Sequence, residues 1–569
     1  MRRIGDSLRK PSPVEWCCLA GGLFLTIHYA WLLDDAFVYF RYIDNWLFLH
    51  FGLVYNQGEY VEGYSSPAWL LLLAALRITR LNYWIIVRIL AVAGFIAFWI
   101  FAVVLNRSLS PRGRPVVNFP LCYVSFLYGP LCYFTSGMET PLVQVIAAVF
   151  CLLIVYPSSR KLQAATAIAP LIRPELAAPF LLCLLWVWFR KRSFPWLMLL
   201  WGALFSGAWM IFRVYYYADL FPNTFYLKDS IDPHQGLLYV WDTVSVYRLG
   251  DWFTFMLLVL AAALFRSRKQ PADQDESATS GIARFRLPER MVMLVAGLSV
   301  AAYVIKIGGD GRHYRYLAFP FCMVVFSMAG LIEQGLAGFS PSRLRWVVYP
   351  AGLAFAALSA AAYPRQLSQH PFPLSDETVG VDKILDATFH RRIREMSPPG
   401  WASGNRIELL QEFETFMCEA PSREYRGTRM GYGCFPIYQS FDYRIIHHLG
   451  LTDPFLARMR MESDRPGHKR GLMPYAEDIM RLNVRAKHKP HRGMYSQAVE
   501  QGRAPRWIRE NIDTIETIER KAYNRHDFLE NLRLAFTFPP QIVPPKPRKG
   551  SRYDKATFQR NRQARQRQD

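Results

Sequence analysis

Two adjacent carboxylates, Asp34 and Asp35, end an apolar run that is long enough to enter a bilayer, and Arg41 follows among aromatic residues. A carboxylate at this depth can serve as a general base that removes the proton of an attacking hydroxyl. Adjacent carboxylates also repel each other, so the pair can titrate as a unit with one raised pKa. For one Asp, the alternative is a marker of the return to water at a helix end. The rest of the chain must decide.

Other charged residues stand beside the apolar blocks in several segments. The candidates besides the first Asp pair and Arg41 are Glu59, Glu62, Glu139, Glu175 and Asp310, the cations Arg173, Lys228, Lys306, Arg312 and Arg315, and the polar residues Asn223 and His313. Charges at a membrane boundary are costly, so a converging set is a hypothesis for a functional site. For any single member, a helix cap or a snorkelling side chain is the alternative. Guanidinium groups suit a phosphate at headgroup depth, which with a general base indicates glycosyl or phosphoryl transfer from a lipid donor.

The composition indicates the elements that position these residues. Hydrophobic residues make up 52% of the 569 residues and aromatic residues 15%, and they form blocks between residues 16 and 362. Blocks of about 16 to 23 residues span or nearly span about 30 Å of hydrocarbon as helices. Residues 363–569 contain no such block. The chain is therefore predicted to be an α-helical polytopic membrane protein with a separate water-facing domain.

The net charge of +22 indicates orientation rather than binding to nucleic acid, because much of it lies in short loops between apolar blocks and in the basic tail. The basic N-terminus is expected inside, as a retained anchor whose helix, about 15–33, delivers the Asp pair to the outer face. The block at 67–81 is expected to lie along the outer interface, with Arg77 and Arg80 snorkelling. This choice gives about eleven transmembrane helices and places residues 363–569 outside.

Other functional classes lack their motifs. A Walker loop, a dinucleotide-binding glycine turn, a nucleophile elbow and a zinc knuckle are all missing from the sequence. The donor is therefore not expected to be a nucleotide sugar used on the cytoplasmic side. We expect no cofactor and no metal site. Carboxylates beside a phosphate are compatible with a divalent cation, but no dedicated ligand cluster calls for one.

An ordered series of outward-facing motifs resembles a known family. The segments are DDAFVYFRY, GLVYNQGEYVEGYSSPAW, SGMETPL, IRPE, YYADLFPNTFYLK, GGDGRHYRYL and LGLTDPFLAR. In this order they resemble the GT-C class of polyprenyl-phosphate-dependent glycosyltransferases, and within it the bacterial arabinofuranosyltransferases and related pilin-modifying enzymes. The resemblance covers residues 31 to about 334 and again about 450–458.

The resemblance implies a GT-C-like fold with interfacial helices in the first outer loop. It also implies a polyprenyl-phosphate arabinofuranose donor, a catalytic Asp at position 34 or 35, and a glycan or pilin-type protein acceptor. The expected location is the bacterial inner membrane, in contact with membrane lipid, with the C-terminal domain in the periplasm. Two alternatives remain open: the same reaction with another lipid-linked sugar, and a lipid-linked glycan transporter without transferase activity.

Three domains are expected: a transmembrane catalytic domain at 1–362, a mixed α/β outer domain at 363–545 and a basic, disordered tail at 546–569. A helix is predicted at about 381–396 from its apolar spacing. Cys418 and Cys434 are the only cysteines of the outer domain. In an oxidising compartment such a pair is expected to form a disulfide.

Overall fold

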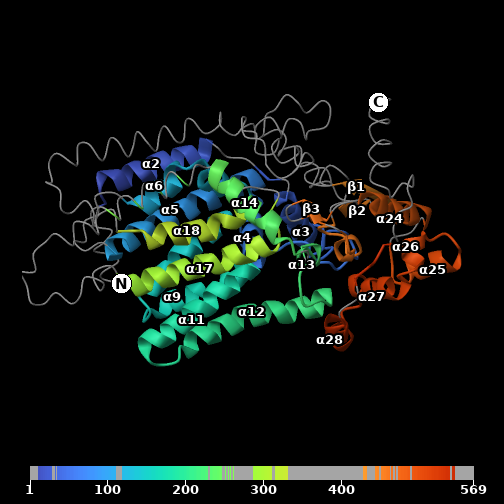
Figure 1. Ribbon diagram of the computed structural model, residues 1–569. Coiled ribbons are helices and arrows are strands. Elements are labelled where there is room, and N and C mark those ends of the chain that lie inside the picture. Colours follow the sequence, from blue (N-terminus) through green and yellow to red (C-terminus); the bar gives the residue numbers. More distant parts are fainter. Residues whose placement is uncertain are drawn as a thin grey trace, which may run out of the picture. The chain divides into compact units, whose positions relative to one another are not determined.

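The computed structural model forms two compact units, each assembled from separate parts of the chain. Unit 1 comprises residues 1–33, 83–206 and 233–404, and unit 2 comprises residues 34–82, 207–232 and 405–569 (Figure 1). The structure describes residues 11–28, 32–33, 35–109, 118–228, 231–246, 286–310, 314–330, 427–431, 443–447, 450–461, 463–465, 468–469, 472–486, 490–537 and 541–544, with four single positions between 250 and 261.

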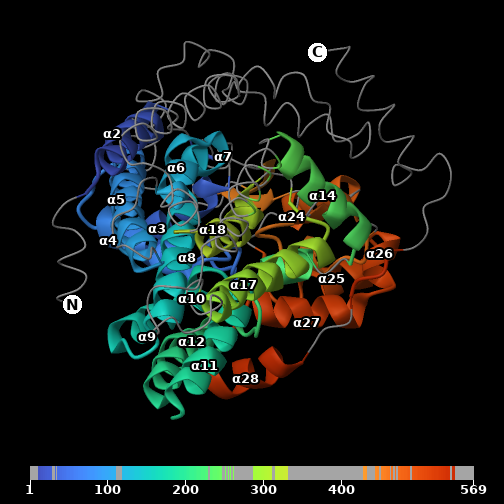
Figure 2. The ribbon, with the colours of Figure 1, turned by 60° about the vertical axis from the view of Figure 1, so that its left-hand side comes forward.

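The secondary-structure elements of unit 1 among the described residues are all helices. Its elements are α2 (Pro13–His28), α5 (Tyr83–Leu109), α6 (Phe119–Phe126), α7 (Tyr128–Phe134), α8 (Thr140–Val155), α9 (Arg160–Thr166), α10 (Ala169–Ile172), η1 (Pro174–Leu176), α11 (Ala177–Lys191), the first half of α12 (Trp196–Tyr217), α14 (Pro233–Val246), α17 (Leu287–Lys306), η2 (Arg315–Leu317) and α18 (Ala318–Ser327). Helix α8 packs against α5 and α18, and α17 packs against α18 and α11 (Figure 2).

Three described helices are long and apolar enough to cross a membrane: α5, α12 and α17. A rise of about 1.5 Å per residue makes even the shortest of them, with 20 residues, about 30 Å long. Helices α2 and α8 are apolar but shorter. The expected last span, about 344–362, and the expected helix at 381–396 lie outside the described residues. The total of about eleven spans therefore stays a prediction.

Helix α2 begins with a capping box. The main-chain N–H of Glu15 donates to Ser12 Oγ at 3.2 Å, and the Ser12 N–H donates to Glu15 Oε2 at 2.8 Å. The same carboxylate accepts a hydrogen bond from Arg107 near the end of α5, at 2.9 Å. Glu15 is completely buried, so its pairing with Arg107 compensates a charge that would otherwise be costly.

Unit 2 combines the first predicted outer loop, a short middle segment and the C-terminal region. Its elements are α3 (Ala36–Leu47), α4 (Pro67–Arg77), the end of α12, α13 (Asn223–Leu227), β1 (Gly427–Gly431), β2 (Tyr443–His447), η5 (Leu456–Arg458), β3 (Ser463–Arg465), β4 (His468–Lys469), α24 (Met473–Ala486), α25 (Met494–Glu500), α26 (Arg506–Arg509), α27 (Ile512–Ala522) and α28 (Phe528–Phe536). Strands β1 and β2 pair in parallel, Gly427 opposite Tyr443, and β3 and β4 pair antiparallel. Helices α25, α26 and α27 lie together (Figure 2).

The core of unit 2 is apolar and crosses its segments. Tyr226 and Leu227 of the middle segment are buried in one cluster with Phe455, Trp507 and Ile518 of the C-terminal region. In α27 the apolar residues recur at helical spacing, and the buried side holds Ile515, Ile518 and Ala522. The C-terminal region therefore owes part of its core to residues that lie more than 200 positions earlier.

Helix α4 covers the block predicted to lie along the interface. With 11 residues it is about 16 Å long, which is too short to cross the hydrocarbon. The expectation that Arg77 snorkels is wrong. Arg77 is buried, and its Nε donates to Asp44 Oδ1 of α3 at 3.0 Å. Asp44 lies one helix away rather than nearby in sequence, so the local pattern did not indicate this pair. Arg80 is exposed.

Candidate functional site

The two carboxylates that the sequence singled out lie at the start of unit 2. Asp34 lies outside the described residues. Asp35 directly precedes α3 and is half-buried, and its side chain forms no capping hydrogen bond to the helix. An Asp at this position would most simply be explained as a helix cap. The side chain of Asp35 does not cap α3 in this way.

Arg41, one turn into α3, is completely enclosed in unit 2. Its Nε donates to the main-chain oxygen of Tyr55 at 2.8 Å, and its guanidinium lies 5.1 Å from the centre of the Tyr55 ring. Burial lowers the pKa of Arg41 to about 10. These contacts fold the first loop back onto α3. The structure thus gives Arg41 a role in shaping the loop, and its predicted contact with phosphate stays a prediction.

Five of the predicted residues converge in unit 1 at the ends of helices, together with Tyr316. They form the Arg173 cluster, which consists of Glu139, Arg173, Glu175, Asp310, Arg315 and Tyr316. Arg173 Nε lies 2.6 Å from Glu175 Oε1, and its Nη1 lies 3.5 Å from Glu139 Oε1. The guanidinium stacks 3.9 Å from the centre of the Tyr316 ring. Arg315 Nη1 lies 3.8 Å from Asp310 Oδ2. The first and last of these residues are more than 170 positions apart in the sequence, and the fold brings all of them together.

Carboxylates outnumber cations in the Arg173 cluster. Burial disfavours the charge of Arg173, but Glu175 and Glu139 outweigh it and raise the pKa of Arg173 above its usual value. Both oxygens of Glu139 are buried without a hydrogen bond among the described residues. Such a buried, incompletely satisfied carboxylate is costly, and sites of this kind are common where ligands bind.

The remaining cationic candidates are placed separately. Lys306 ends α17 and is exposed, whereas Lys228 follows α13 and is half-buried. Arg312 and His313 lie outside the described residues. Lys228 belongs to unit 2 and Lys306 to unit 1, so the structure describes each within its own unit.

Glu59 of the first loop is held by the C-terminal region. Arg444 of β2 donates from Nη2 to Glu59 Oε1 at 2.7 Å, and the same nitrogen lies 3.3 Å from Asp453 Oδ2. Asn56 donates to the other Glu59 oxygen at 2.7 Å. All three charged side chains are buried. Burial raises the pKa of Asp453, although Arg444 opposes this effect. We call Glu59, Arg444 and Asp453 the Arg444 triad.

Glu62 is bound by the end of α12. Arg213 donates to the Glu62 carboxylate from Nε and from Nη2, and Nη2 lies 3.2 Å from Oε1. Trp209 Nε1 donates to the same Oε1 at 3.2 Å. This two-pronged pairing is the geometry in which an arginine holds a carboxylate most firmly. Glu62 therefore anchors the first loop to α12.

Asn223 connects all three segments of unit 2. Its main-chain N–H donates to the main-chain carbonyl oxygen of Glu62 at 2.8 Å, and its Nδ2 lies within hydrogen-bond distance of the carbonyl oxygens of Gly450, Leu451 and Asp453. Its Oδ1 accepts from Arg458 Nη1 at 2.9 Å. Asn223, a predicted site residue, is thus a structural junction.

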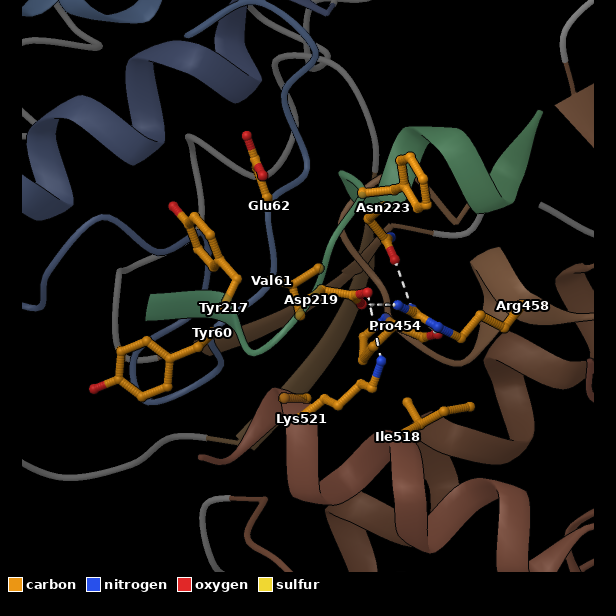
Figure 3. A pocket seen from close by; sticks show the side chains of 12 residues that line it. Tyr60, Val61, Glu62, Tyr217, Asp219, Asn223, Pro454, Arg458, Ile518 and Lys521 are labelled. Atoms are coloured by element: carbon orange, nitrogen blue, oxygen red, sulfur yellow. Dashed lines mark hydrogen bonds and ion pairs between the residues drawn. The ribbon is translucent and has the colours of Figure 1, made fainter. Parts of the chain in front are cut away.

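A pocket opens beside this junction (Figure 3). It is lined by Tyr60, Val61, Glu62, Tyr217, Asp219, Phe221, Asn223, Pro454, Arg458, Ile518, Lys521 and Ala522. Arg458 and Lys521 both point to Asp219, as Figure 3 shows, with Lys521 Nζ 3.4 Å from Oδ1 and Arg458 Nη2 2.5 Å from Oδ2. Tyr226 also donates to Asp219 Oδ1, at 2.5 Å.

Several of these residues were not predicted from the sequence. Asp219, Asp453 and Arg458 lie within the motifs YYADLFPNTFYLK and LGLTDPFLAR. These motifs were recognised in the sequence, and they could have indicated the three residues as candidates. Arg444 and Lys521 belong to no motif. Cys418 and Cys434 lie outside the described residues, where their disulfide stays a prediction. Within the described part of the chain, no group of three or more His, Cys, Asp or Glu side chains is placed to hold a metal ion.

Comparison with known proteins finds two curated relatives. The chain is 29% identical over 352 residues to the terminal β-(1→2)-arabinofuranosyltransferase of Mycobacterium tuberculosis, covering 56% of this chain and 55% of that protein. It is 27% identical over 338 residues to the protein of the same name from Corynebacterium glutamicum, covering 52% of this chain and 48% of the relative. The chain thus spans about half the length of the curated relatives it matches. No family model matches it, and no solved structure matches it significantly. The predicted resemblance to bacterial arabinofuranosyltransferases is confirmed.

Proposed function

We propose that this protein is a membrane glycosyltransferase that transfers arabinofuranose from a polyprenyl phosphate to an acceptor hydroxyl at the outer face of the bacterial inner membrane. The observation that carries the proposal is the similarity to two proteins that are both named terminal β-(1→2)-arabinofuranosyltransferase. Helices long enough to cross a membrane and buried charges at the helix ends of unit 1 support it.

The proposed reaction breaks the bond between the anomeric carbon of the donor sugar and the phosphate oxygen. A new bond forms between that carbon and the acceptor oxygen. The acceptor proton passes to the carboxylate of Asp34 or Asp35, and the phosphate leaves on its lipid. The general base raises the nucleophilicity of the hydroxyl at the moment of attack, which is worth about 10² to 10⁴ in rate.

Cations stabilise the phosphate that leaves. Arg173 and Arg315 of unit 1 are our candidates. Because carboxylates already surround Arg173, its guanidinium is held in one orientation rather than left mobile. A fixed cation costs less reorganisation when negative charge develops in the transition state.

We propose a glycan acceptor, because the names of both relatives describe transfer of a terminal arabinofuranose in a β-(1→2) linkage, a type of linkage that joins sugars. A pilin-type protein is the other acceptor to be tried. The C-terminal region is placed in the periplasm in this proposal. A reporter fused to the C-terminus that is active only in the cytoplasm would contradict that orientation.

The test is a transfer assay. Protein purified in detergent receives labelled decaprenyl-phosphate arabinofuranose with either an arabinan oligosaccharide or pilin. Label in the oligosaccharide supports the proposal, whereas label in pilin would indicate that the acceptor is a protein. If the protein in vesicles moves the lipid across the membrane without any transfer of label, it is a transporter and the proposed enzyme activity is refuted. Asp513→Asn is the matched control for the Asp34→Asn and Asp35→Asn variants, because Asp513 is an exposed aspartate of α27.

A further inference from the structure

Helix α28 presents an apolar face that the described residues of unit 2 leave uncovered. The side chains of Phe528, Leu529 and Phe536 are 45%, 68% and 69% exposed. At 3.6 residues per turn, these three side chains lie within about 100° of one another around the helix. Leu534 and Ala535 lie on the other side and are buried. The helix therefore packs one apolar face into unit 2 and leaves a second one open, and exposed apolar patches of this kind mark interaction sites.

The end of α12 fixes the position of this open face. The last carbonyl groups of a helix have no hydrogen-bond partner within the helix itself. In α12, the carbonyl of Tyr215 accepts from Asn531 Nδ2 at 2.6 Å, and the carbonyl of Tyr216 accepts from Asn524 Nδ2 at 3.1 Å. Asn531 belongs to α28, and Asn524 lies in the segment that leads into it. These two bonds tie α28 to the last turn of α12, beside which it lies in Figure 1.

The last turn of α12 has the features of a membrane boundary. Helix α12 is one of the three described helices that are long and apolar enough to cross a bilayer. Its side chain Ile211 is exposed, as expected of a residue that faces lipid. The helix ends in three consecutive tyrosines at 215–217, and tyrosine is enriched at the depth of the lipid headgroups. A helix that is hydrogen-bonded to this turn therefore lies at headgroup depth.

The surroundings of the open face carry an excess of positive charge. Arginines on or beside α28 are Arg492, Arg520, Arg525 and Arg533. The carboxylates are Asp527, which caps the helix at the N–H of Glu530, and Glu530 itself, which lies 3.3 Å from Arg492 and 3.4 Å from Arg520. Four arginines therefore face two carboxylates. An apolar helix face with arginines around it is complementary to a membrane that contains anionic lipids.

We propose that α28 binds the surface of the lipid bilayer and so holds the C-terminal region against the membrane. Phe528, Leu529 and Phe536 enter the boundary between headgroups and acyl chains, and the arginines lie among the anionic headgroups. A second copy of the chain would also cover an apolar face, but it would not require that face to lie at the end of a membrane helix. The proposal rests on the membrane helices and not on transferase activity, so either can fail without the other.

Photo-cross-linking of the full chain tests this surface. The chain is placed in vesicles of phosphatidylcholine and phosphatidylglycerol in equal amounts, and p-benzoylphenylalanine replaces Leu529 or, in a second variant, Phe536. The matched control replaces Val484, which is 52% exposed and belongs to α24, a helix that α27 separates from α28 in both views (Figures 1 and 2). Mass spectrometry should find at least about 5-fold more phospholipid bound at 529 and 536 than at 484.

Agreement between positions 529 and 536 guards against a local distortion caused by the cross-linker. Yields at these two positions that do not exceed the yield at Val484 would refute the proposal. A cross-link to a second copy of the chain in place of lipid would refute it too, because the face would then be a protein interface.

The arginines are tested by the headgroups of the cross-linked lipids. In the chain with the cross-linker at 529, phosphatidylglycerol should exceed its share in the vesicle, and Arg533→Gln should reduce this excess by about 2-fold or more. Arg509→Gln is the matched control, because Arg509 is an exposed arginine of α26, and the excess should not change. An excess that is missing, or that both variants reduce equally, would contradict the role of the arginines.

Discussion

Replacing Arg444 with Met tests whether the first loop depends on the C-terminal region. The change removes the cation between Glu59 and Asp453 and leaves two buried carboxylates without it. Breaking a buried ion pair by removing one partner costs about 3–5 kcal/mol. We take about 4 kcal/mol, because the lost hydrogen bond to Glu59 is short and Asn56 still satisfies one oxygen.

The assay is thermal unfolding of the full chain in detergent at pH 8. At about 2 °C per kcal/mol for a large domain, the midpoint of unit 2 should fall by about 8 °C. Arg506→Met is the control, because Arg506 and its partner Glu510 are exposed, and such pairs contribute less than about 1 kcal/mol. The double variant Arg444→Met with Glu59→Gln should recover part of the loss.

The same variant has a pH signature. Without Arg444, nothing opposes the effect of burial, which raises the pKa of Asp453 in the folded chain above its value in the unfolded chain. The folded state then binds more protons, so the variant loses stability as the pH rises through this folded-state pKa. Its deficit relative to the unaltered chain should be smaller at pH 5 than at pH 8. A deficit no larger than that of Arg506→Met, or one independent of pH, would refute the role assigned to the triad.

Four other outcomes are expected. Asn at the catalytic position, Asp34 or Asp35, should lower transfer about 10²-fold while donor binding survives, and near-normal transfer in both single variants would move the search to other carboxylates. Arg173→Ala should weaken donor binding more than it lowers the rate at saturating donor, as measured by the split between KM and kcat. Gly63→Ala places a Cβ 2.6 Å from a side-chain carbon of the C-terminal region, so the unfolding midpoint should fall, whereas Gly207→Ala in α12, where the added Cβ meets open space and φ is not positive, should lower it much less. Burial raises the pKa of Glu519 to about 7, so stability falls as pH rises from about 4.5 to about 7, and Glu519→Gln should remove this part of the pH dependence of the midpoint.

The long helices could be predicted from the sequence because the length of an apolar block determines whether it can form a helix that spans the membrane. The first helix, predicted at about 15–33, is found at 13–28. The ends differ because capping, as at Ser12 and Glu15, depends on single side chains rather than on average hydropathy.

The charged residues of the outer loops could be named from the sequence, but their partners could not. Glu59 meets Arg444 across 385 positions, and Lys521 meets Asp219 across 302. No local pattern encodes a pairing at that distance. Arg41 shows the converse problem, since a cation beside aromatic residues looks the same in sequence whether it faces a ligand or a main-chain carbonyl.

The discontinuous assembly of unit 2 sets an order of events during biosynthesis. The first loop leaves the ribosome long before Arg444 is made, and at about 5–20 residues per second the delay is about 20–80 seconds. During that interval Glu59 has no Arg444 to pair with, and Gly63 has no C-terminal segment to pack against. A nascent chain that stops before residue 444 therefore carries an unfinished loop that proteases can recognise. Completion of the loop becomes a built-in check that the whole chain has been synthesised.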